Sequence, residues 1–316
     1  MRWSLYGVPQ GSVLRPILFV LYVADVLQLV YDHGLMSHAY ADDTQILGIR
    51  CPSESEALQN RVSDCLDAVG SWMAANRLLL NNDKTEALWR SSLRRQHQIP
   101  TIPVRVGSAS VQPVATVRNL GVYLDADATV RAHVTSTVRA CFAINLLRQI
   151  NSVRHSLTRP ALLTLLRALV ISKLDYCNSV LAGAPAVLLS RFQSVLNAAV
   201  RLVFSANRSA HTTPLLQELH WLRVPEQIQF RLCVLTYRCL YGTAPQYLSE
   251  CMLPSSSLSS GRQLRSTESV SLLVPSTCRT PIGDCAFPVA AARAWNSLPD
   301  VSHIEVSSTL IDDVTN

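Results

Sequence analysis

The chain has 316 residues, of which 48% are hydrophobic and 16% are charged. This composition excludes an intrinsically disordered chain, which has few apolar residues and many charges, and it excludes a collagen-like fibre. The length is about twice that of an ordinary single domain, so two packed units, or one unit with a long appendage, are expected.

The net charge of +6 is distributed unevenly along the chain. Residues 1–127 carry 11 basic and 12 acidic side chains, residues 128–217 carry 10 and 1, and residues 218–316 carry 7 and 9. Of the 28 basic residues, 26 are arginines, whose planar guanidinium group binds phosphate through paired hydrogen bonds. The middle segment therefore favours a phosphate-bearing partner, or else it is a solvated helical face in an arginine-biased sequence.

The sequence predicts neither a membrane span nor a secretion signal. The richest apolar run, Ile17 to Ala24, lies between Arg15 and Asp25 and is shorter than the roughly 20 residues that cross a bilayer as a helix. The first residues do not form the basic, apolar and small-residue pattern of a signal peptide. An intracellular protein of the nucleus or cytoplasm, with no membrane partner, is expected.

The nine cysteines are scattered, odd in number and contain no C-x-x-C pair. This pattern predicts reduced thiols that mostly fill the core. A zinc site built from Cys278, Cys285 and His303 is the alternative, although the spacing of these residues matches no common zinc finger.

The first part of the chain is expected to mix helices and short strands. Ser12 is expected to cap a buried helix over Val13–Val30, and the segment Leu35–Ile49 predicts a β-hairpin whose tip contains Asp42 and Asp43. Apolar side chains recur with helical spacing from Leu58 to Trp72, which predicts a helix that covers a sheet. Short strands are predicted over Leu78–Leu80, Glu86–Trp89 and Leu120–Leu124.

The remainder is expected to be mostly helical, so the fold class is α+β. Glycine and proline punctuation predicts helices over Val130–Ile150, Arg159–Leu181, Ala186–Phe204 and Pro225–Leu240. Residues 254–283 are rich in Ser, Thr, Pro and Gly, which predicts a loop or linker before a short tail around Phe287–Trp295.

Asp42 and Asp43 are the candidate metal ligands. Like charges at a hairpin tip repel each other unless a cation lies between them. Hard carboxylate oxygens suit Mg²⁺, and a pair of such ions is the usual means of nucleotidyl transfer. The dipeptide alone is weak support for catalysis, because solvated turns often contain it.

Four motifs occur in the order and at the spacing of a reverse transcriptase palm. They are Gly7-Val8-Pro9-Gln10-Gly11-Ser12-Val13-Leu14, Tyr40-Ala41-Asp42-Asp43, Asn82-Asp83-Lys84-Thr85 and Asn119-Leu120-Gly121-Val122-Tyr123-Leu124. The chain resembles the reverse transcriptase of non-LTR retrotransposons, most closely the jockey-like and chicken-repeat-like long interspersed elements. The resemblance continues through Lys173-Leu174-Asp175-Tyr176-Cys177-Asn178-Ser179, Trp221 and Phe287–Pro299.

The resemblance implies a division of the chain and a chemistry. Residues 1–127 would form a partial palm, residues 128–253 a helical thumb and connection-like region, and residues 254–316 a linker and tail. The expected reaction is RNA-directed DNA synthesis with Mg²⁺, an RNA template, a DNA primer and deoxynucleotides.

The resemblance also assigns roles to single residues. Asp42 and Asp43 would bind the metal ions, with Tyr40 beside the primer terminus, and Lys84 would be a general acid for the leaving pyrophosphate. Gln10 and Gly11 would contact the template and the nucleotide, and the primer would be gripped by Leu120, Gly121 and Tyr123. The alternatives are that Lys84 is an ordinary strand-edge lysine and that Tyr123 only packs. Asp175 and Tyr176 are expected to be thumb packing residues with no catalytic role.

The chain departs from the family near its N-terminus, at Arg15, and again after Pro299. A reverse transcriptase has a third metal-binding aspartate on a strand before the glutamine-glycine loop, whereas here Met1 stands only six residues before Gly7. Arg15 also stands where the family usually has glycine. We therefore expect a fragment truncated at its N-terminus that is inactive alone, with an unpaired apolar hairpin edge that favours aggregation. The missing strand would come from another chain or an upstream exon. The alternative is a catalytically dead, nucleic-acid-binding relic.

Overall fold

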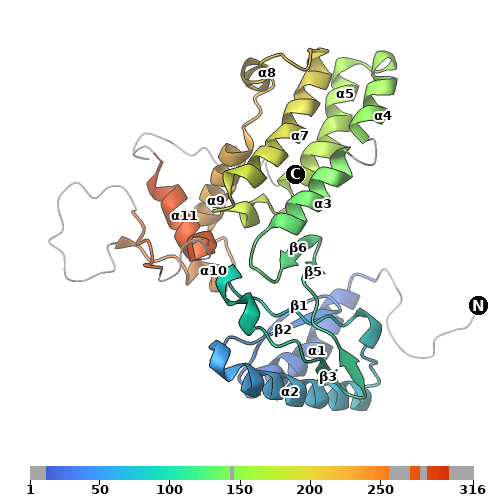
Figure 1. The fold of residues 1–316 in the computed structure, drawn as a ribbon, viewed down its shortest axis with the longest axis vertical. Coiled ribbons are helices and arrows are strands. Elements are labelled where there is room, and N and C mark those ends of the chain that lie inside the picture. Colours follow the sequence, from blue (N-terminus) through green and yellow to red (C-terminus); the bar gives the residue numbers. More distant parts are fainter. Residues whose placement is uncertain (1–11, 143–145, 256–270, 278–282, 299–316) are drawn as a thin grey trace, which may run out of the picture. The chain divides into compact units, whose positions relative to one another are not determined.

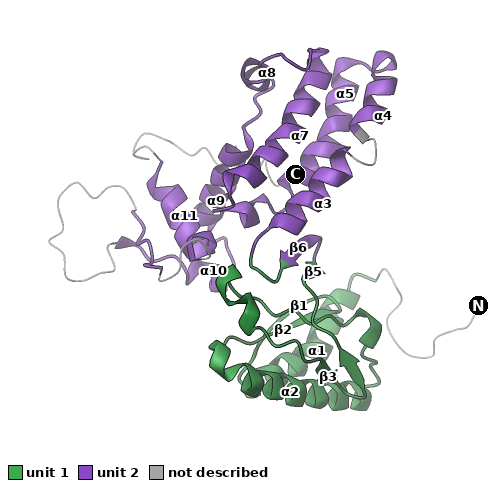
Figure 2. Cartoon of the chain, in the orientation of Figure 1, with its two compact units in different colours: residues 1–119, 125–128 green, residues 120–124, 129–316 purple. Residues whose placement is uncertain are grey.

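The computed structural model describes residues 12–142, 146–255, 271–277 and 283–298. The chain divides into two compact units, drawn green and purple in Figure 2. Unit 1 comprises residues 1–119 and 125–128, and unit 2 comprises residues 120–124 and 129–316. Both contain helices, and short strands occur in unit 1 and at its boundary, so the α+β class is confirmed.

Unit 1 consists of two helices and short hairpins. Its β1 and β2 strands are antiparallel, and so are β3 and β4. Figure 1 labels all of these elements except β4; they are α1 (Arg15–Asp32), β1 (Met36–Tyr40), β2 (Asp43–Leu47), α2 (Ser55–Ala75), β3 (Val104–Val106), β4 (Ala109–Val111) and β5 (Thr116–Asn119). The described strands make only two-stranded sheets, so each strand of the β1–β2 pair has one open edge.

The α2 helix carries the core of unit 1, as its helical spacing predicts. Helix α2 packs against α1 and β3. The buried side chains of this core are Val26, Val30, Leu35, Leu58, Cys65 and Val69. Burial raises the pKa of the Cys65 thiol. The stripe from Leu58 to Val69 therefore faces the core.

The expectation of a capped and buried helix over Val13–Val30 is wrong in two respects. Helix α1 begins at Arg15, and its N-cap residue Leu14 makes no side-chain cap, so Ser12 only accepts a backbone bond from Arg15. Most of the helix is exposed, with Ile17 at 60% and Leu21 at 68%. Helix α1 carries apolar side chains on every side. The neighbouring described elements of unit 1 cover only one narrow stripe of its surface.

Two predicted strands, Leu78–Leu80 and Glu86–Trp89, do not form. Leu79 is 95% exposed, and in the second segment Ala87 makes one isolated parallel bridge with Pro113. A strand there cannot extend through Pro113, because proline has no N–H group to donate. The third predicted strand starts late, since β6 runs from Val122 to Asp125.

Helices dominate unit 2. They are α3 (Arg131–Phe142), α4 (Leu146–Val153), α5 (Arg159–Leu166), α6 (Ser172–Asp175), α7 (Ala186–Phe204), α8 (Thr213–Glu218), α9 (Val224–Leu240), α10 (Gln246–Ser249) and α11 (Phe287–Asn296). The predicted helix over Ala186–Phe204 is confirmed residue for residue. The one predicted over Arg159–Leu181 is divided, because a π-helical turn separates α5 from α6.

Helix α7 is the centre of the unit 2 core. It packs against α3, α5 and α9, and seven of its side chains are buried, with Phe192 at 1% exposure. Among the described residues, α7 is also long and apolar enough to cross a membrane by length and composition alone. This segment is not the apolar run Ile17 to Ala24 considered above, and its buried side chains place α7 in the core of unit 2.

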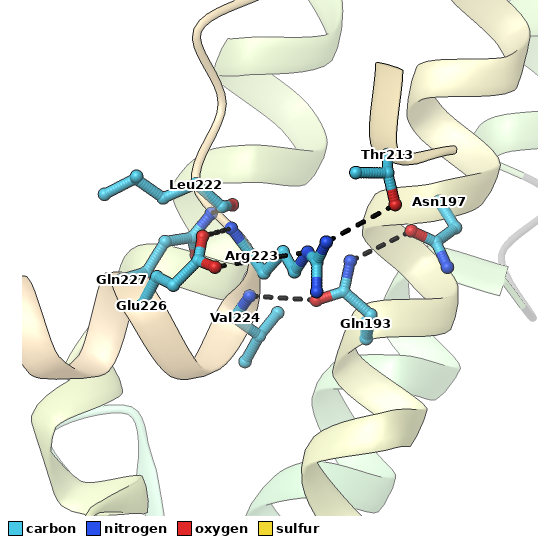
Figure 3. Close-up of polar contacts among 8 residues, drawn as sticks. All are labelled: Gln193, Asn197, Thr213, Leu222, Arg223, Val224, Glu226 and Gln227. Carbon is cyan, nitrogen blue, oxygen red and sulfur yellow. Dashed lines mark hydrogen bonds and ion pairs between the residues drawn. The ribbon is translucent and has the colours of Figure 1, made fainter. Parts of the chain in front are cut away.

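The N-terminus of α9 is held by side chains on two elements (Figure 3). The Glu226 carboxylate accepts a hydrogen bond of 2.8 Å from the backbone N–H of Arg223. The Gln193 carbonyl oxygen, on α7, accepts one of 2.9 Å from the N–H of Val224, while its amide donates to Asn197. The first backbone N–H groups of a helix have no acceptor within the helix, and these bonds provide acceptors for them.

The cysteines fill the core less than expected. Of the eight in the described residues, Cys65, Cys141 and Cys239 are buried, whereas Cys51, Cys177 and Cys285 are exposed. The possible zinc site cannot be placed, because Cys278 and His303 lie outside the described residues.

Candidate functional site

The candidate site begins at the tip of the β1–β2 hairpin. Tyr40 pairs with Asp43 across the strands, and Ala41 adopts a left-handed φ of 52°, so Ala41 and Asp42 make the turn. The predicted hairpin tip is confirmed. Both Asp42 and Asp43 are exposed, as ligands of a substrate-bridging metal must be.

The strand register places Tyr40 and Asp43 on the open face of this hairpin. Directly paired residues of antiparallel strands point to the same side of the sheet. The pair Ser37 and Ile46 lies on the other side, where Ile46 packs against the core of unit 1. Tyr40, 66% exposed, and Asp43 therefore lie away from the core, on the side accessible to a substrate.

A hydrogen bond connects this open face to another motif. Gln45 lies two residues after Asp43, and therefore on the same side of β2. Its amide donates to the side-chain oxygen of Asn119 at 2.7 Å. Gln45 was not among the residues predicted from the sequence, although its two-residue spacing from Asp43 was the available signal.

Asn119 ends β5, the first strand of a hairpin whose second strand is β6. At the end of this hairpin that lies away from the turn, the Thr116 hydroxyl donates a hydrogen bond of 3.1 Å to the Asp125 carboxylate. The hairpin turn is formed by Leu120 and Gly121, with φ values of 44° and 84°. Leu120 is 42% exposed, and Tyr123 is half-buried.

The donor atoms at Asp42 and Asp43 fit Mg²⁺ in kind but not in number. Adjacent exposed carboxylates offer the hard oxygen ligands that Mg²⁺ prefers. Within the part of the chain that the structure describes, however, no group of three or more His, Cys, Asp or Glu residues could hold a metal ion. Water and substrate phosphates would have to complete the coordination shell.

The structure describes the position of Lys84 but not those of Gln10 and Gly11. Lys84 ends a short 3-10 helix, Asn82–Lys84, and is exposed. No hydrogen bond or ion pair between described residues joins its side chain to Asp42 or Asp43. Gln10 and Gly11 lie outside the described residues.

The motifs around this hairpin belong to a region with known relatives. Residues 2–124 match the family model described as reverse transcriptase (RNA-dependent DNA polymerase). This segment contains the Tyr40-Ala41-Asp42-Asp43 motif and Lys84. The expected resemblance to a reverse transcriptase is thus confirmed for the first part of the chain.

Two curated relatives extend the similarity beyond that segment. The probable RNA-directed DNA polymerase from transposon BS of Drosophila melanogaster is 24% identical over 70% of this chain and 25% of the relative. The corresponding protein from transposon X-element of the same fly is 25% identical over 70% of this chain and 24% of the relative. The chain thus spans about a quarter of the length of these polymerases. No solved structure gave a significant match.

Residues 128–217, which follow the segment matched to reverse transcriptases, contain ten basic residues, and four of these bond to other described residues. Arg154, Arg191 and Arg201 donate to protein oxygens of Leu202, Thr135 and Ala210, and Arg159 pairs with Glu218 at 2.8 Å. The remaining basic residues are exposed and in no ion pair with another described residue; they are Arg131, Arg139, Arg148, Arg167, Lys173 and Arg208. Five of these six follow one another along α3 to α6.

Asp175 is the single acidic residue in this basic segment. Burial raises the pKa of its carboxyl group above the ordinary 3.8, and the positive charge of Arg231 partly opposes this shift. The net shift is upward, so the folded chain holds the ionised carboxylate less well than the unfolded chain does.

Replacing Asp175 with asparagine is therefore expected to stabilise the chain at pH 7. Because the folded pKa is raised, the wild-type chain gains stability as the pH falls through that value, whereas an asparagine side chain does not titrate and has no such dependence. The advantage of Asp175→Asn should shrink between pH 7 and pH 4, as measured by urea denaturation of both proteins at each pH. An asparagine variant that is less stable than wild type at pH 7 would contradict this prediction.

Proposed function

We propose that this chain is part of the RNA-directed DNA polymerase of a jockey-like non-LTR retrotransposon. The observation that carries the proposal is the position of Asp42 and Asp43, which lie at an exposed hairpin tip inside the segment that matches reverse transcriptases. Its substrates would be an RNA template, a DNA primer and deoxynucleotides, handled inside the cell.

Each proposed residue has one task in this reaction. Asp42 and Asp43 would hold Mg²⁺, and the bound ion would supply activation of the primer hydroxyl and charge neutralisation at the leaving group. Tyr40, on the same face as Asp43, lies against the primer terminus. Lys84 donates a proton to the pyrophosphate.

Two further segments bind the nucleic acid. Gln10 and Gly11 contact the template and the incoming nucleotide, and the β5–β6 turn with Leu120, Gly121 and Tyr123 contacts the primer. A glycine beside a base or sugar lets the backbone approach closely.

The proposed metal site needs a third carboxylate besides Asp42 and Asp43. Two carboxylates bind a pair of divalent ions less firmly than three do, and the described residues bring only two together. The aligned part of this chain covers only about a quarter of each relative, which leaves room for a segment that carries it. Another chain or a preceding segment would supply it, and the chain alone would be inactive.

A second candidate function is nucleic-acid binding without catalysis. The six exposed cations on α3 to α6 and after α7 favour it, because arginine side chains bind the phosphates of a duplex backbone without reading its sequence. This function requires neither the third carboxylate nor a bound metal ion.

Metal binding tests the role of the hairpin carboxylates independently of activity. Mn²⁺, which takes oxygen ligands as Mg²⁺ does, can be titrated into the chain and measured by electron paramagnetic resonance. Asp42→Asn and Asp43→Asn should each weaken Mn²⁺ binding by about tenfold, or about 1.4 kcal/mol. Asp83→Asn, which removes an exposed carboxylate beside Lys84, is the matched control and should bind Mn²⁺ normally. Equal binding by all four proteins would contradict the assignment.

Primer extension tests whether the isolated chain already contains every group that the polymerase reaction needs. The chain is incubated with an RNA template, a DNA primer, deoxynucleotides and Mg²⁺, beside Asp42→Asn. If the wild-type chain extends the primer and Asp42→Asn does not, the polymerase function is supported. The third metal-binding carboxylate is then already present in the chain. Binding of the hybrid without extension supports the binding function for the isolated chain, and failure to bind the hybrid contradicts both.

A further inference from the structure

Tyr176 was expected only to pack within the thumb, but its contacts in unit 2 are more specific than packing. The Tyr176 hydroxyl donates a hydrogen bond to the backbone carbonyl oxygen of Leu120 at 2.6 Å. Its ring lies against Gly121, where a Cβ atom would be 3.1 Å from the ring atom Cε1. One side chain thus holds both residues of the β5–β6 turn.

The turn needs such support, because its backbone is unusual. Leu120 and Gly121 both have positive φ, at 44° and 84°. A two-residue hairpin turn with two positive φ angles favours Asn-Gly, and a left-handed conformation costs about 1 to 2 kcal/mol for a residue such as leucine. A hydrogen bond to the Leu120 carbonyl contributes about 1 kcal/mol, which offsets much of this cost.

Tyr176 is itself fixed from both sides. Helix α6 ends at Asp175, and the next residue after Tyr176, Cys177, has a left-handed φ of 52°. On the two flanks, Leu174 is 1% exposed and Asn178 is 3% exposed. These buried neighbours anchor the backbone that carries the half-exposed Tyr176 side chain.

We propose that Tyr176 is a positioning residue that fixes the β5–β6 turn in the conformation that contacts the primer terminus. This inference rests on the proposed function of that turn, whereas the hydrogen bond and the ring contact are independent of it. Glycine suits position 121 because its φ is positive and because a Cβ atom there would press on the Tyr176 ring at 3.1 Å.

Hydrogen exchange of the full chain tests the first half of the proposal. Tyr176→Phe keeps the ring but removes the hydroxyl, and Tyr247→Phe, at a side chain that is 66% exposed, is the matched control. Amides of residues 116–124 should exchange about fivefold faster in Tyr176→Phe, the equivalent of one hydrogen bond. Gly121→Ala should accelerate the same amides, whereas Tyr247→Phe should not. Unchanged exchange in both Tyr176→Phe and Gly121→Ala would overturn the proposal.

Binding measurements test the second half. We compare an RNA–DNA hybrid that has a recessed primer 3′ end with a blunt hybrid of the same length. Tyr176→Phe should lose about fivefold in affinity for the recessed end relative to the blunt hybrid, and Tyr247→Phe should lose none. If the turn exchanges faster in Tyr176→Phe but the preference for the recessed end is unchanged, the proposed role of Tyr176 in primer binding is overturned. If the wild-type chain binds neither hybrid, the proposed function fails, and the exchange data still decide whether Tyr176 holds the turn.

Discussion

Replacing Arg131, Arg139 and Arg148 with glutamine is expected to lower the affinity of the chain for an RNA–DNA hybrid by about 100-fold at 0.1 M salt. These three side chains lie on α3 and α4, are exposed, and form no ion pair with a described residue. Each contact between an arginine and a phosphate releases counterions, so their loss should also reduce the slope of log affinity against log salt concentration by about 3.

A control with the same loss of charge separates local contacts from net charge. Arg105, Arg223 and Arg293 are each paired with a carboxylate, on Asp67, Glu226 and Asp284 respectively. Replacing these three with glutamine should change the affinity and the salt slope much less. Fluorescence anisotropy of a labelled hybrid at several salt concentrations measures both quantities. A wild-type affinity that does not change with salt would contradict the proposed binding surface.

Local features of the sequence predicted the elements that local interactions determine. The Asp42-Asp43 hairpin tip and the bounds of α7 follow from alternation, helical spacing and flanking glycine or proline residues. Burial was predicted less well. The apolar run in α1 resembles a core helix, but its burial depends on partners that the described residues of unit 1 do not provide.

Contacts between distant parts of the sequence could not be predicted at all. Gln45 and Asn119 are 74 residues apart, and Tyr176 and Leu120 are 56 apart, so no periodicity connects them. The sequence likewise did not show which basic side chains bond to other parts of the protein. The count of ten basic residues in 128–217 is correct, but three of these arginines donate to protein oxygens inside unit 2 instead of facing a partner.

Phe192→Ala is expected to destabilise unit 2 by about 3 to 5 kcal/mol, the usual cost of deleting a buried phenylalanine ring. Phe192 is 1% exposed at the centre of α7, and its ring centroid lies 6.4 Å from that of the buried His133 on α3. The cavity would be surrounded by α7 and the helices that pack on it, which have little freedom to collapse.

The measurement is hydrogen exchange resolved by peptide, with Phe230→Ala as the matched control. Phe230 lies on α9 and is 43% exposed, so its removal leaves no closed cavity and should cost less than about 1 kcal/mol. In Phe192→Ala, the slowest amides of α3, α7 and α9 should exchange faster by two orders of magnitude or more, since about 1.4 kcal/mol corresponds to tenfold. The amides of α2 should change little, because its buried residues form a separate hydrophobic cluster with α1. Equal acceleration of amide exchange in α2 and α7 would show that the two clusters unfold as one. If Phe192→Ala loses hybrid binding and Phe230→Ala does not, the binding surface lies on the helices that Phe192 supports.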